Sequence, residues 1–420
     1  MCRFKFMPKM QSKIEKLIAE LCPNGVEFKG LGEITAWDKK FNGISKDKQQ
    51  KTLSFKHISA KNLKDLENSN GKVKLLATGQ FDGWTTEELA DSNLNNGEVI
   101  TVPSGGSANL KYYKGKFVDS GNILGSSIDA EILNLKYCYY YLLTKNDFIE
   151  SSFRGSGVKH PDMTRILSIK IPLPPIAIQE EIVKILDSFT ELEAELEAEL
   201  EARELQYKHY RNKLLSINSG NVQWKTLGEV AEYRRGSFPQ PYGETKWYGG
   251  EGAMPFVQVA DVGENMRLIE DTKQKISKLA QPKSVFVPSG TVIVTLQGSI
   301  GRVAVTQYDS YVDRTLAIFE SFKNKINKKY FAYQLESKFS VEKENARGST
   351  IKTITKEEFT KFKIPIPSLE MQDYIVTKLD AFNLLLNDIS IGLPAELSAR
   401  RQQYEYYRNK LLTFKELQVG

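Results

Sequence analysis

Apolar and polar positions along this chain follow two kinds of pattern, and the two kinds take turns. Short segments that alternate or run apolar, bounded by Gly, Ser and Pro, are typical of strands joined by turns. The clearest of these segments are 97–103, 284–296 and 302–306. They predict two β-rich regions, 35–135 and 231–329, each followed by a helical pattern, at 136–152 and 328–344.

Two longer segments carry apolar residues three and four positions apart, which is the spacing of one helix face. The stripe of the first consists of Ile178, Ile182, Ile185, Phe189, Leu192 and Leu196, and that of the second of Met371, Ile375, Leu379, Phe382, Leu386 and Ile389. A stripe sustained over at least three heptads favours coiled-coil pairing over a helix that lies on a globular core. The second helix is expected to break at Gly392-Leu393-Pro394.

A long internal repeat determines the predicted architecture. Residues 169–189 (IKIPLPPIAIQEEIVKILDSF) match residues 362–382 (FKIPIPSLEMQDYIVTKLDAF), and 207–215 (YKHYRNKLL) match 404–412 (YEYYRNKLL). Two copies about half a chain apart predict two structural units of the same construction. The fold class is therefore α+β, with two β-rich domains joined by two long antiparallel coiled-coil helices in a pseudo-two-fold internal duplication.

The order of segments also predicts how the duplication closes. Leu31-Gly32-Glu33-Ile34 matches Leu227-Gly228-Glu229-Val230. The first copy of this segment follows a short helical pattern at 12–21, whereas the second follows a long helix that ends near Ile217. We expect the N-terminal helix to dock beside the C-terminal one and make the two halves equivalent.

The middle of the first long helix is an acidic repeat. Residues 191–205 (ELEAELEAELEAREL) repeat Glu-Ala-Glu-Leu and hold seven glutamates up to Glu204. Phosphates would repel these carboxylates, so we expect the segment to face solvent or a basic protein, with pairs such as Glu199–Arg203. Roughly forty helical residues span about 60 Å, and one added tetrapeptide lengthens the helix by about 6 Å. Repeat number should therefore tune the separation of the two β-rich domains.

Composition adds limits to this picture. The chain has 420 residues, a net charge of +6 and 40% hydrophobic residues, which fits a globular protein of two or three domains. Three cysteines and three histidines lie far apart, which disfavours disulfides and metal sites. No stretch approaches about 18 uncharged apolar residues. We expect a cytoplasmic protein without a membrane segment.

Together these residues resemble the specificity subunits of type I restriction–modification enzymes. The resemblance rests on Ile171-Pro172 with Gln179, Ile182 and Leu186-Asp187, and on Ile364-Pro365 with Gln372, Ile375 and Leu379-Asp380. It also rests on the closing runs Tyr207–Arg211 and Tyr404–Arg408, and on acidic tetrapeptides at the place where the family often has them. The chain departs from the family in its leading residues 1–9 and in His209, which replaces a Tyr.

The resemblance implies the partners and cofactors. Double-stranded DNA would be bound by this chain, two modification subunits would methylate adenine with S-adenosylmethionine, and two restriction subunits would use ATP and Mg. This chain would contribute sequence choice and no catalysis. In agreement, it contains no Asn/Asp-Pro-Pro-Phe/Tyr motif and no GxxxxGK[S/T] loop, and its Gly-rich stretches at 104–107, 121–127 and 297–301 are interpreted as tight turns.

The resemblance also names the domains. We expect an N-terminal extension and short helix at 1–22, a first target-recognition domain at 23–175 and a central coiled-coil helix at 176–217. A second target-recognition domain at 218–368 and a C-terminal coiled-coil helix at 369–420 follow. Because 35–135 and 231–329 largely differ in sequence, we expect them to read different half-sites of an asymmetric, bipartite target with an unread gap.

Candidate DNA contacts follow from side-chain chemistry. Base edges in the major groove are read by Arg, Lys, Asn and Gln, whereas backbone contacts from Lys, Arg and Ser position without specifying. The base-reading candidates are Lys72, Lys74, Gln80, Ser107, Asn109 and Lys111 in the first domain, and Arg234, Arg235, Gln258, Gln297, Ser299, Arg302 and Arg314 in the second. The phosphate candidates, which repeat in both domains, are Arg154, Ser156, Lys159, Arg347, Ser349 and Lys352. An ordinary solvated surface role is the alternative for each.

Two other functions remain open on this sequence. One is a specificity module of another restriction or modification system. The other is a non-catalytic coiled-coil adaptor with two protein-binding heads. Low-salt binding to random duplex would separate the second from a DNA reader, because an adaptor should not bind.

Overall fold

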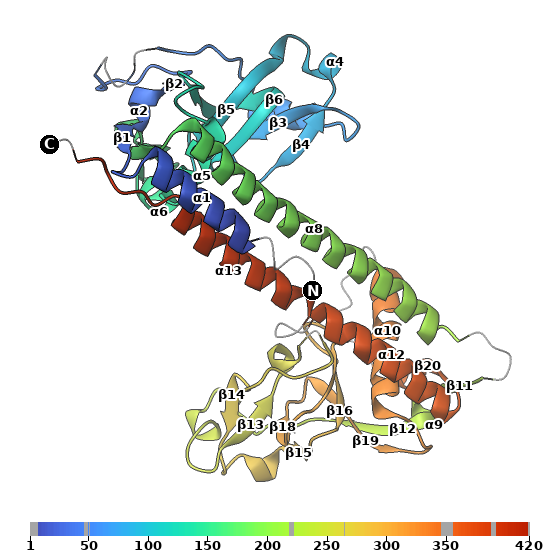
Figure 1. The fold of residues 1–420 in the computed structure, drawn as a ribbon. Helices are drawn as coiled ribbons and strands as arrows, with labels where there is room; N and C mark the ends of the chain where they lie inside the picture. Colours follow the sequence, from blue (N-terminus) through green and yellow to red (C-terminus); the bar gives the residue numbers. More distant parts are fainter. Residues whose placement is uncertain are drawn as a thin grey trace. The chain divides into compact units, whose positions relative to one another are not determined.

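The chain folds into two compact units that share one long helix. The structure, a computed structural model, describes residues 7–45, 49, 51–217, 222–263, 265–345, 356–387 and 392–418. Unit 1 consists of Met1–Ala194 and Ala399–Gly420, and unit 2 of Glu195–Ser398. The first half of helix α8 (Ile176–Leu215; Figure 1) therefore belongs to unit 1 and its second half to unit 2.

Unit 1 holds a six-stranded sheet of order β2-β7-β5-β6-β3-β4. Its strands are β2 (Thr35–Trp37), β3 (Val73–Ala77), β4 (Asp82–Thr85), β5 (Asn95–Pro103), β6 (Lys111–Ser120) and β7 (Asn122–Ser127). The strand predicted at 97–103 is confirmed as the main part of β5. The stretch 121–127 is a correction: only Gly121, with φ of 76°, makes the turn, and the remainder is strand β7.

Unit 2 builds its β-rich part differently, from two four-stranded sheets. Their orders are β12-β19-β16-β17 and β14-β13-β18-β15. The strands are β12 (Ala231–Arg235), β13 (Met254–Val257), β14 (Gln274–Ile276), β15 (Val285–Val287), β16 (Val292–Thr295), β17 (Val303–Val305), β18 (Ser310–Val312) and β19 (Leu316–Phe322). The strands predicted at 284–296 and 302–306 are confirmed as β15, β16 and β17.

Around these unlike sheets the two units repeat one frame. A short helix, α2 (Leu31–Ile34) or α9 (Leu227–Val230), follows a strand that pairs antiparallel with the Ile-Pro strand of the same unit. The paired strands are β1 (Glu27–Gly30) with β10 (Lys170–Leu173), and β11 (Gln223–Thr226) with β20 (Lys363–Ile366). The register is the same, since Phe28 lies opposite Pro172 and Trp224 opposite Pro365.

The repeated Gln and Asp each accept equivalent hydrogen bonds in the two units. In unit 1, buried Gln179 accepts a 2.9 Å hydrogen bond from the Asn134 N–H, which precedes helix α5 (Leu135–Leu143), and Asp187 accepts 2.6 Å and 2.7 Å bonds from Tyr140 and Lys136. In unit 2, Gln372 accepts from the Asn327 N–H at 2.9 Å, and Asp380 from Tyr333 and Lys329 at 2.9 Å and 2.6 Å. Helix α10 (Lys328–Asn345) takes the place of α5.

One helical prediction differs from the structure in the first half, and one is confirmed in the second. The helix predicted at 136–152 is two helices, α5 and α6 (Asn146–Glu150), because Thr144 and Lys145 end the first one. The C-terminal helix is divided into α12 (Leu369–Asn387) and α13 (Leu393–Leu411), so the break predicted at Gly392 is confirmed.

Helices pair antiparallel within each unit. In unit 1, Phe189 of α8 contacts Tyr404 and Tyr407 of α13, while Glu193, further along α8, bonds Arg401, further back along α13, at 2.6 Å. Helix α1 (Met7–Leu21) lies beside α13 (Figure 1), and its Ile14 shares the core with Leu411 and Leu412. The predicted docking of the N-terminal helix is confirmed.

The predicted stripe is buried over most of its length. Ile178, Ile182, Ile185 and Phe189 are buried, as are Ile375, Leu379 and Leu386; Leu192, Leu196 and Phe382 are half-buried. The prediction for Met371 is wrong, since this side chain is 47% exposed. Its counterpart in unit 1, Ile178, belongs to the same core cluster as Ile14 of α1, whereas the described part of unit 2 has no counterpart of α1. Ile389 lies outside the described residues. The acidic segment 191–205 is mostly exposed, and its Glu199–Arg203 pair is present at 3.4 Å.

Candidate nucleic-acid interface

Three loops of unit 1 meet at one place, and we call them the first loop cluster: residues 77–82, 104–110 and 154–160. The Asn109 amide donates to the carbonyls of Thr78 and Gly79 at 3.1 Å and 2.9 Å, which joins the second loop to the first. The Gly106 N–H donates to the Lys159 carbonyl at 2.8 Å, which joins the third. Long-range pairing thus gathers residues that are about 80 positions apart in the chain.

Lys111 fixes the shape of loop 77–82. Its ammonium donates to the carbonyls of Ala77 at 2.7 Å, Gly79 at 2.8 Å and Phe81 at 3.5 Å. Burial lowers the pKa of this lysine, while the nearby Asp82 carboxylate opposes the shift. The side chains of Lys111 and Asn109 are therefore occupied in holding this loop, and we assign them a positioning role instead of direct contact with a base.

Several predicted DNA contacts are exposed on the same cluster. They are Gln80, Ser107, Arg154, Ser156 and Lys159. Arg154 is close to one acid, with 3.8 Å between its guanidinium and Asp162. The structure thus brings two base-reading candidates, Gln80 and Ser107, together with the phosphate candidates at 154–159, and their contacts with DNA remain predictions.

Two lysine candidates belong to strand β3 or precede it, outside the three loops of the first loop cluster. Lys72 precedes β3, at the opposite end of that strand from loop 77–82, and is exposed. Lys74 is mostly buried: its ammonium pairs with Asp82 and lies 4.4 Å from the ring centre of Trp84. These contacts favour a structural role for Lys74.

Four segments of unit 2 meet in the same manner, and we call them the second loop cluster: residues 235–238, 257–258, 296–299 and 312–316. The Asp313 N–H donates to the Val257 carbonyl at 3.0 Å, and the Leu296 N–H to the Thr315 carbonyl at 2.9 Å. The Gly236 N–H bonds the Leu316 carbonyl at 3.1 Å. The cluster gathers the predicted residues Arg235, Gln258, Gln297, Ser299 and Arg314.

Tyr242 joins two segments of this cluster. Its hydroxyl donates to the carboxylate of Asp313, which is 2% exposed, and accepts from the Gln258 amide at 3.1 Å. Burial and the bond to Asp313 both raise the pKa of Tyr242, so the phenol stays protonated. The Arg314 guanidinium lies 5.5 Å from the centre of its ring.

The other candidates of unit 2 have different surroundings. Arg234 is 3.7 Å from Glu320, and the guanidinium of Arg302 donates to the Val262 carbonyl at 3.3 Å, so both are tied to their own unit. Gly298 and Gly301, with φ of 67° and 77°, confirm the tight turn predicted at 297–301. Arg347, Ser349 and Lys352 lie outside the described residues.

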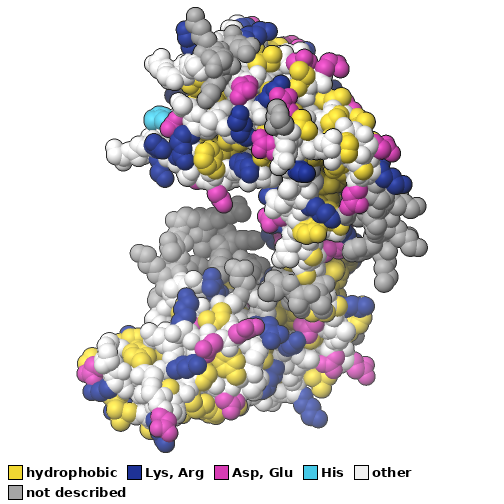
Figure 2. All heavy atoms as spheres, turned by 60° about the vertical axis from the view of Figure 1, so that its left-hand side comes forward, with side chains coloured by type: hydrophobic (Ala, Val, Ile, Leu, Met, Phe, Trp, Pro, Cys, Tyr) yellow, Lys and Arg dark blue, Asp and Glu magenta, His cyan; other side chains and the backbone are white. Residues whose placement is uncertain are grey.

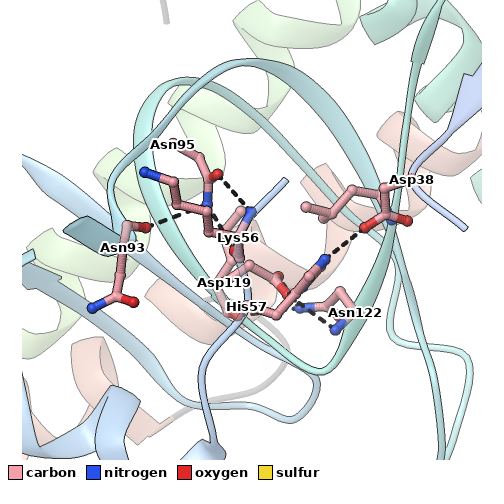
Figure 3. A network of polar contacts seen from close by, with 9 residues as sticks. Asp38, Lys56, His57, Asn93, Asn95, Asp119 and Asn122 are labelled. Carbon is pink, nitrogen blue, oxygen red and sulfur yellow. Dashed lines mark hydrogen bonds and ion pairs between the residues drawn. The ribbon is translucent and has the colours of Figure 1, made fainter. Parts of the chain in front are cut away.

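A polar network that the sequence did not reveal secures the segment before β3 in unit 1. Figure 3 shows the His57 ring between two carboxylates, with Nδ1 2.8 Å from Asp119 and Nε2 2.8 Å from Asp38. Both carboxylates have fully buried side chains, and hydrogen bonds to them raise the pKa of His57 to about 9. The protonated imidazole therefore holds His57 against Asp119 of strand β6 and against Asp38.

Charges elsewhere on the surface are mixed. In Figure 2, Lys and Arg side chains are interspersed with Asp and Glu over the visible face. Within the described ranges, no group of three His, Cys, Asp or Glu side chains could hold a metal ion. None of the helices in those ranges is both long and apolar enough to span a bilayer.

Comparisons with known proteins agree with the duplicated layout. Residues 53–202 and 220–399 each match the family described as "Type I restriction modification DNA specificity domain". The chain is 30% identical to the specificity subunit of the Escherichia coli type I restriction enzyme EcoR124I/EcoR124II, covering 96% of this chain and 97% of that protein. A putative type I specificity subunit from Haemophilus influenzae is 29% identical, covering 78% and 86%.

Solved structures have the same fold. The S subunit of a type I restriction–modification system from M. genitalium matches with a TM-score of 0.57 and 17% identity, over 92% of this chain and 96% of that one. A chain from a structural study of complex assembly and conformational transition in the type I system matches with a TM-score of 0.59 and 17% identity, over 93% and 98%.

Proposed function

Because this chain belongs to the type I restriction–modification DNA specificity family, we propose that it selects the DNA sequence on which a type I complex acts, each head reading one half of a bipartite target. The first head comprises residues 35–135 and the second residues 231–329. The observation that carries the proposal is that one frame, repeated down to individual hydrogen bonds, supports two differently built heads.

The contrast between frame and heads has a functional meaning. Equivalent contacts of Gln179 and Gln372, or of Asp187 and Asp380, present each head on its helices in the same way. A six-stranded sheet in one unit and two four-stranded sheets in the other then expose different loops. Different side chains facing base edges read different sequences, so the two half-sites should differ.

The chemical steps belong to partner subunits in this proposal. Two modification subunits would bind S-adenosylmethionine and methylate adenine, and two restriction subunits would use ATP and Mg to translocate and cleave. The chain itself lacks the adenine-methylation motif and the phosphate-binding loop that such steps use. The complex would act on DNA in the cytoplasm.

The proposal is tested by expressing the chain with its type I modification subunit in a host without restriction systems and mapping methylated adenines. We expect one asymmetric target of two short specific parts separated by a fixed gap, present only when this chain is present. A palindromic or contiguous mark, or the same mark without this chain, would contradict the proposal. Low-salt binding of the purified chain to random duplex separates it from a protein-binding adaptor.

A further inference from the structure

Arg314 differs from Arg234, another exposed arginine of the same head, in its surroundings. It is exposed on the turn between β18 and β19, and no carboxylate of the described residues lies within 4.0 Å of its guanidinium. Arg234 of the same head is close to Glu320. The acid nearest in sequence, Asp313, is turned inward.

The carboxylate of Asp313 accepts hydrogen bonds from uncharged groups. One oxygen accepts from the Tyr242 hydroxyl, and the other from the N–H and hydroxyl of Thr315 at 3.0 Å and 2.5 Å. Asp313 is 2% exposed, so the network is shielded from water. The buried negative charge therefore fixes the turn and leaves the guanidinium of Arg314 outside.

The ring of Tyr242 restricts where this guanidinium can lie. The ring packs against Phe238, with 4.8 Å between centroids, and its hydroxyl is held by Asp313 and by Gln258. Arg314 lies over the ring at 5.5 Å, within the range of a cation–π contact. A planar cation held on a fixed ring loses little conformational entropy when it binds, which favours bidentate recognition.

We propose that Arg314 determines specificity in the second head by donating both arms of its guanidinium to a guanine in the major groove, and that Tyr242 positions it. Guanine presents the O6 and N7 acceptors that fit this fork, and Arg to guanine is the commonest specific contact. The inference rests on the proposed function of the chain, because it assigns one base of the predicted second half-site to one side chain.

The test measures which sequences are methylated by the complex of this chain with its modification subunits. Each position of both half-sites is varied over the four bases, and the wild-type chain is compared with Arg314→Ala, Arg314→Lys and Tyr242→Phe. Arg267→Ala is the matched control, since Arg267 is an exposed arginine of the same head that lies outside the second loop cluster. The first half-site reports in every variant whether the complex still assembles.

We expect Arg314→Ala to relax the requirement for guanine at one position of one half-site. Discrimination between the four bases at that position should fall about 5- to 150-fold. Arg314→Lys should relax the same position, because an ammonium keeps the charge and loses the fork. Tyr242→Phe keeps the ring and should reduce discrimination at that position by a smaller factor. The other half-site, and both half-sites in Arg267→Ala, should be unchanged.

Two results would overturn the inference. One is that both Arg314 variants keep the wild-type target with its discrimination intact. The other is that Arg314→Ala reduces methylation of all sequences equally and Arg314→Lys restores it, which would identify a phosphate contact. If Arg314→Ala fails to fold, Arg314→Lys decides alone. If even the wild-type chain directs no bipartite mark, the proposed function has failed, which is a separate outcome.

Discussion

Phe189 of α8 stacks on Tyr407 of α13, with ring centroids 5.6 Å apart and ring planes at 29°. The equivalent pair in unit 2, Phe382 and Tyr210, lies 5.9 Å apart at 19°. Each unit thus joins the Phe of one repeat to the closing run of the other repeat. Each unit therefore contains helical segments from both repeats.

Replacing Phe189 by Ala should destabilise unit 1. Phe189 is 3% exposed, and truncating a buried Phe typically costs about 3–5 kcal/mol through lost burial and the cavity left behind. Urea unfolding followed by circular dichroism measures the effect. Tyr374→Ala is the control, because Tyr374 is 53% exposed on α12 and its loss should change the free energy of unfolding by less than about 0.5 kcal/mol. Equal effects would contradict the assigned packing.

The helices and paired strands that repeat in both units could be predicted from sequence, because they depend on the spacing of residues close together in the chain. The helical stripes, the Ile-Pro strands and the break at Gly392 follow from periodicity, proline and glycine, and the repeat supplied the stripes and the Ile-Pro strands twice. Met371 failed for a non-local reason: helix α1 adds to the core around Ile178 and has no counterpart in the described part of unit 2. Spacing along one helix does not show which faces another element covers.

The candidate site was predictable only in part. Side-chain chemistry pointed to Gln258 and Arg314, but it could not show that Tyr242 joins them, since Tyr242 reaches Asp313 across 71 positions. It also placed Lys111 among the base readers, whereas that ammonium holds three carbonyls. Sheet order decides such contacts, and sheet order depends on long-range pairing that periodicity does not report.

Stability should fall with rising pH between about 6.5 and 9 because of His57. Its pKa is raised from 6.5 to about 9 by hydrogen bonds to Asp119 and Asp38, so the folded chain binds more protons than the unfolded chain in this interval. The contribution of His57 is complete below pH 6.5 and is lost as the pH passes 9. The measurement is the urea midpoint at pH 6.5 and 9. His57→Gln should flatten this difference, while His209→Gln, at an exposed position, should keep it.

Removing the Gln179 side chain should cost far more than a surface change. Its amide donates to the carbonyls of Ile132 and Pro174, both at 2.8 Å, and its carbonyl accepts from the Asn134 N–H. Gln179→Leu leaves these buried groups unpaired, and we expect a loss of about 2–4 kcal/mol. Thermal unfolding compares it with Gln206→Leu on the exposed part of α8. A small effect would mean that water satisfies the freed groups.

Lys111→Met should loosen loop 77–82 and disturb the reading of one half-site. The carbonyls of Ala77, Gly79 and Phe81 lose their shared donor, so hydrogen exchange of this loop should speed up while the helices keep their protection. Methylation mapping should show relaxed choice in the half-site that Arg314 variants leave intact. Lys114→Met is the control on the same strand, since its side chain is 70% exposed. If hydrogen exchange of the loop speeds up while the methylated target stays unchanged, the loop does not take part in recognition.

Arg154→Ala should weaken binding to every sequence alike, because a contact to phosphate carries no base information. Arg154 is 64% exposed in the first loop cluster, and its nearest acid, Asp162, is 3.8 Å away. The slope of log binding constant against log salt should fall in magnitude by about 0.9 for the lost contact. Binding of duplexes with and without the target, measured at several salt concentrations, checks this. Arg203→Ala, on the acidic segment of α8, should leave the slope unchanged. A changed target sequence in Arg154→Ala, with the slope unaltered, would instead make Arg154 a base reader.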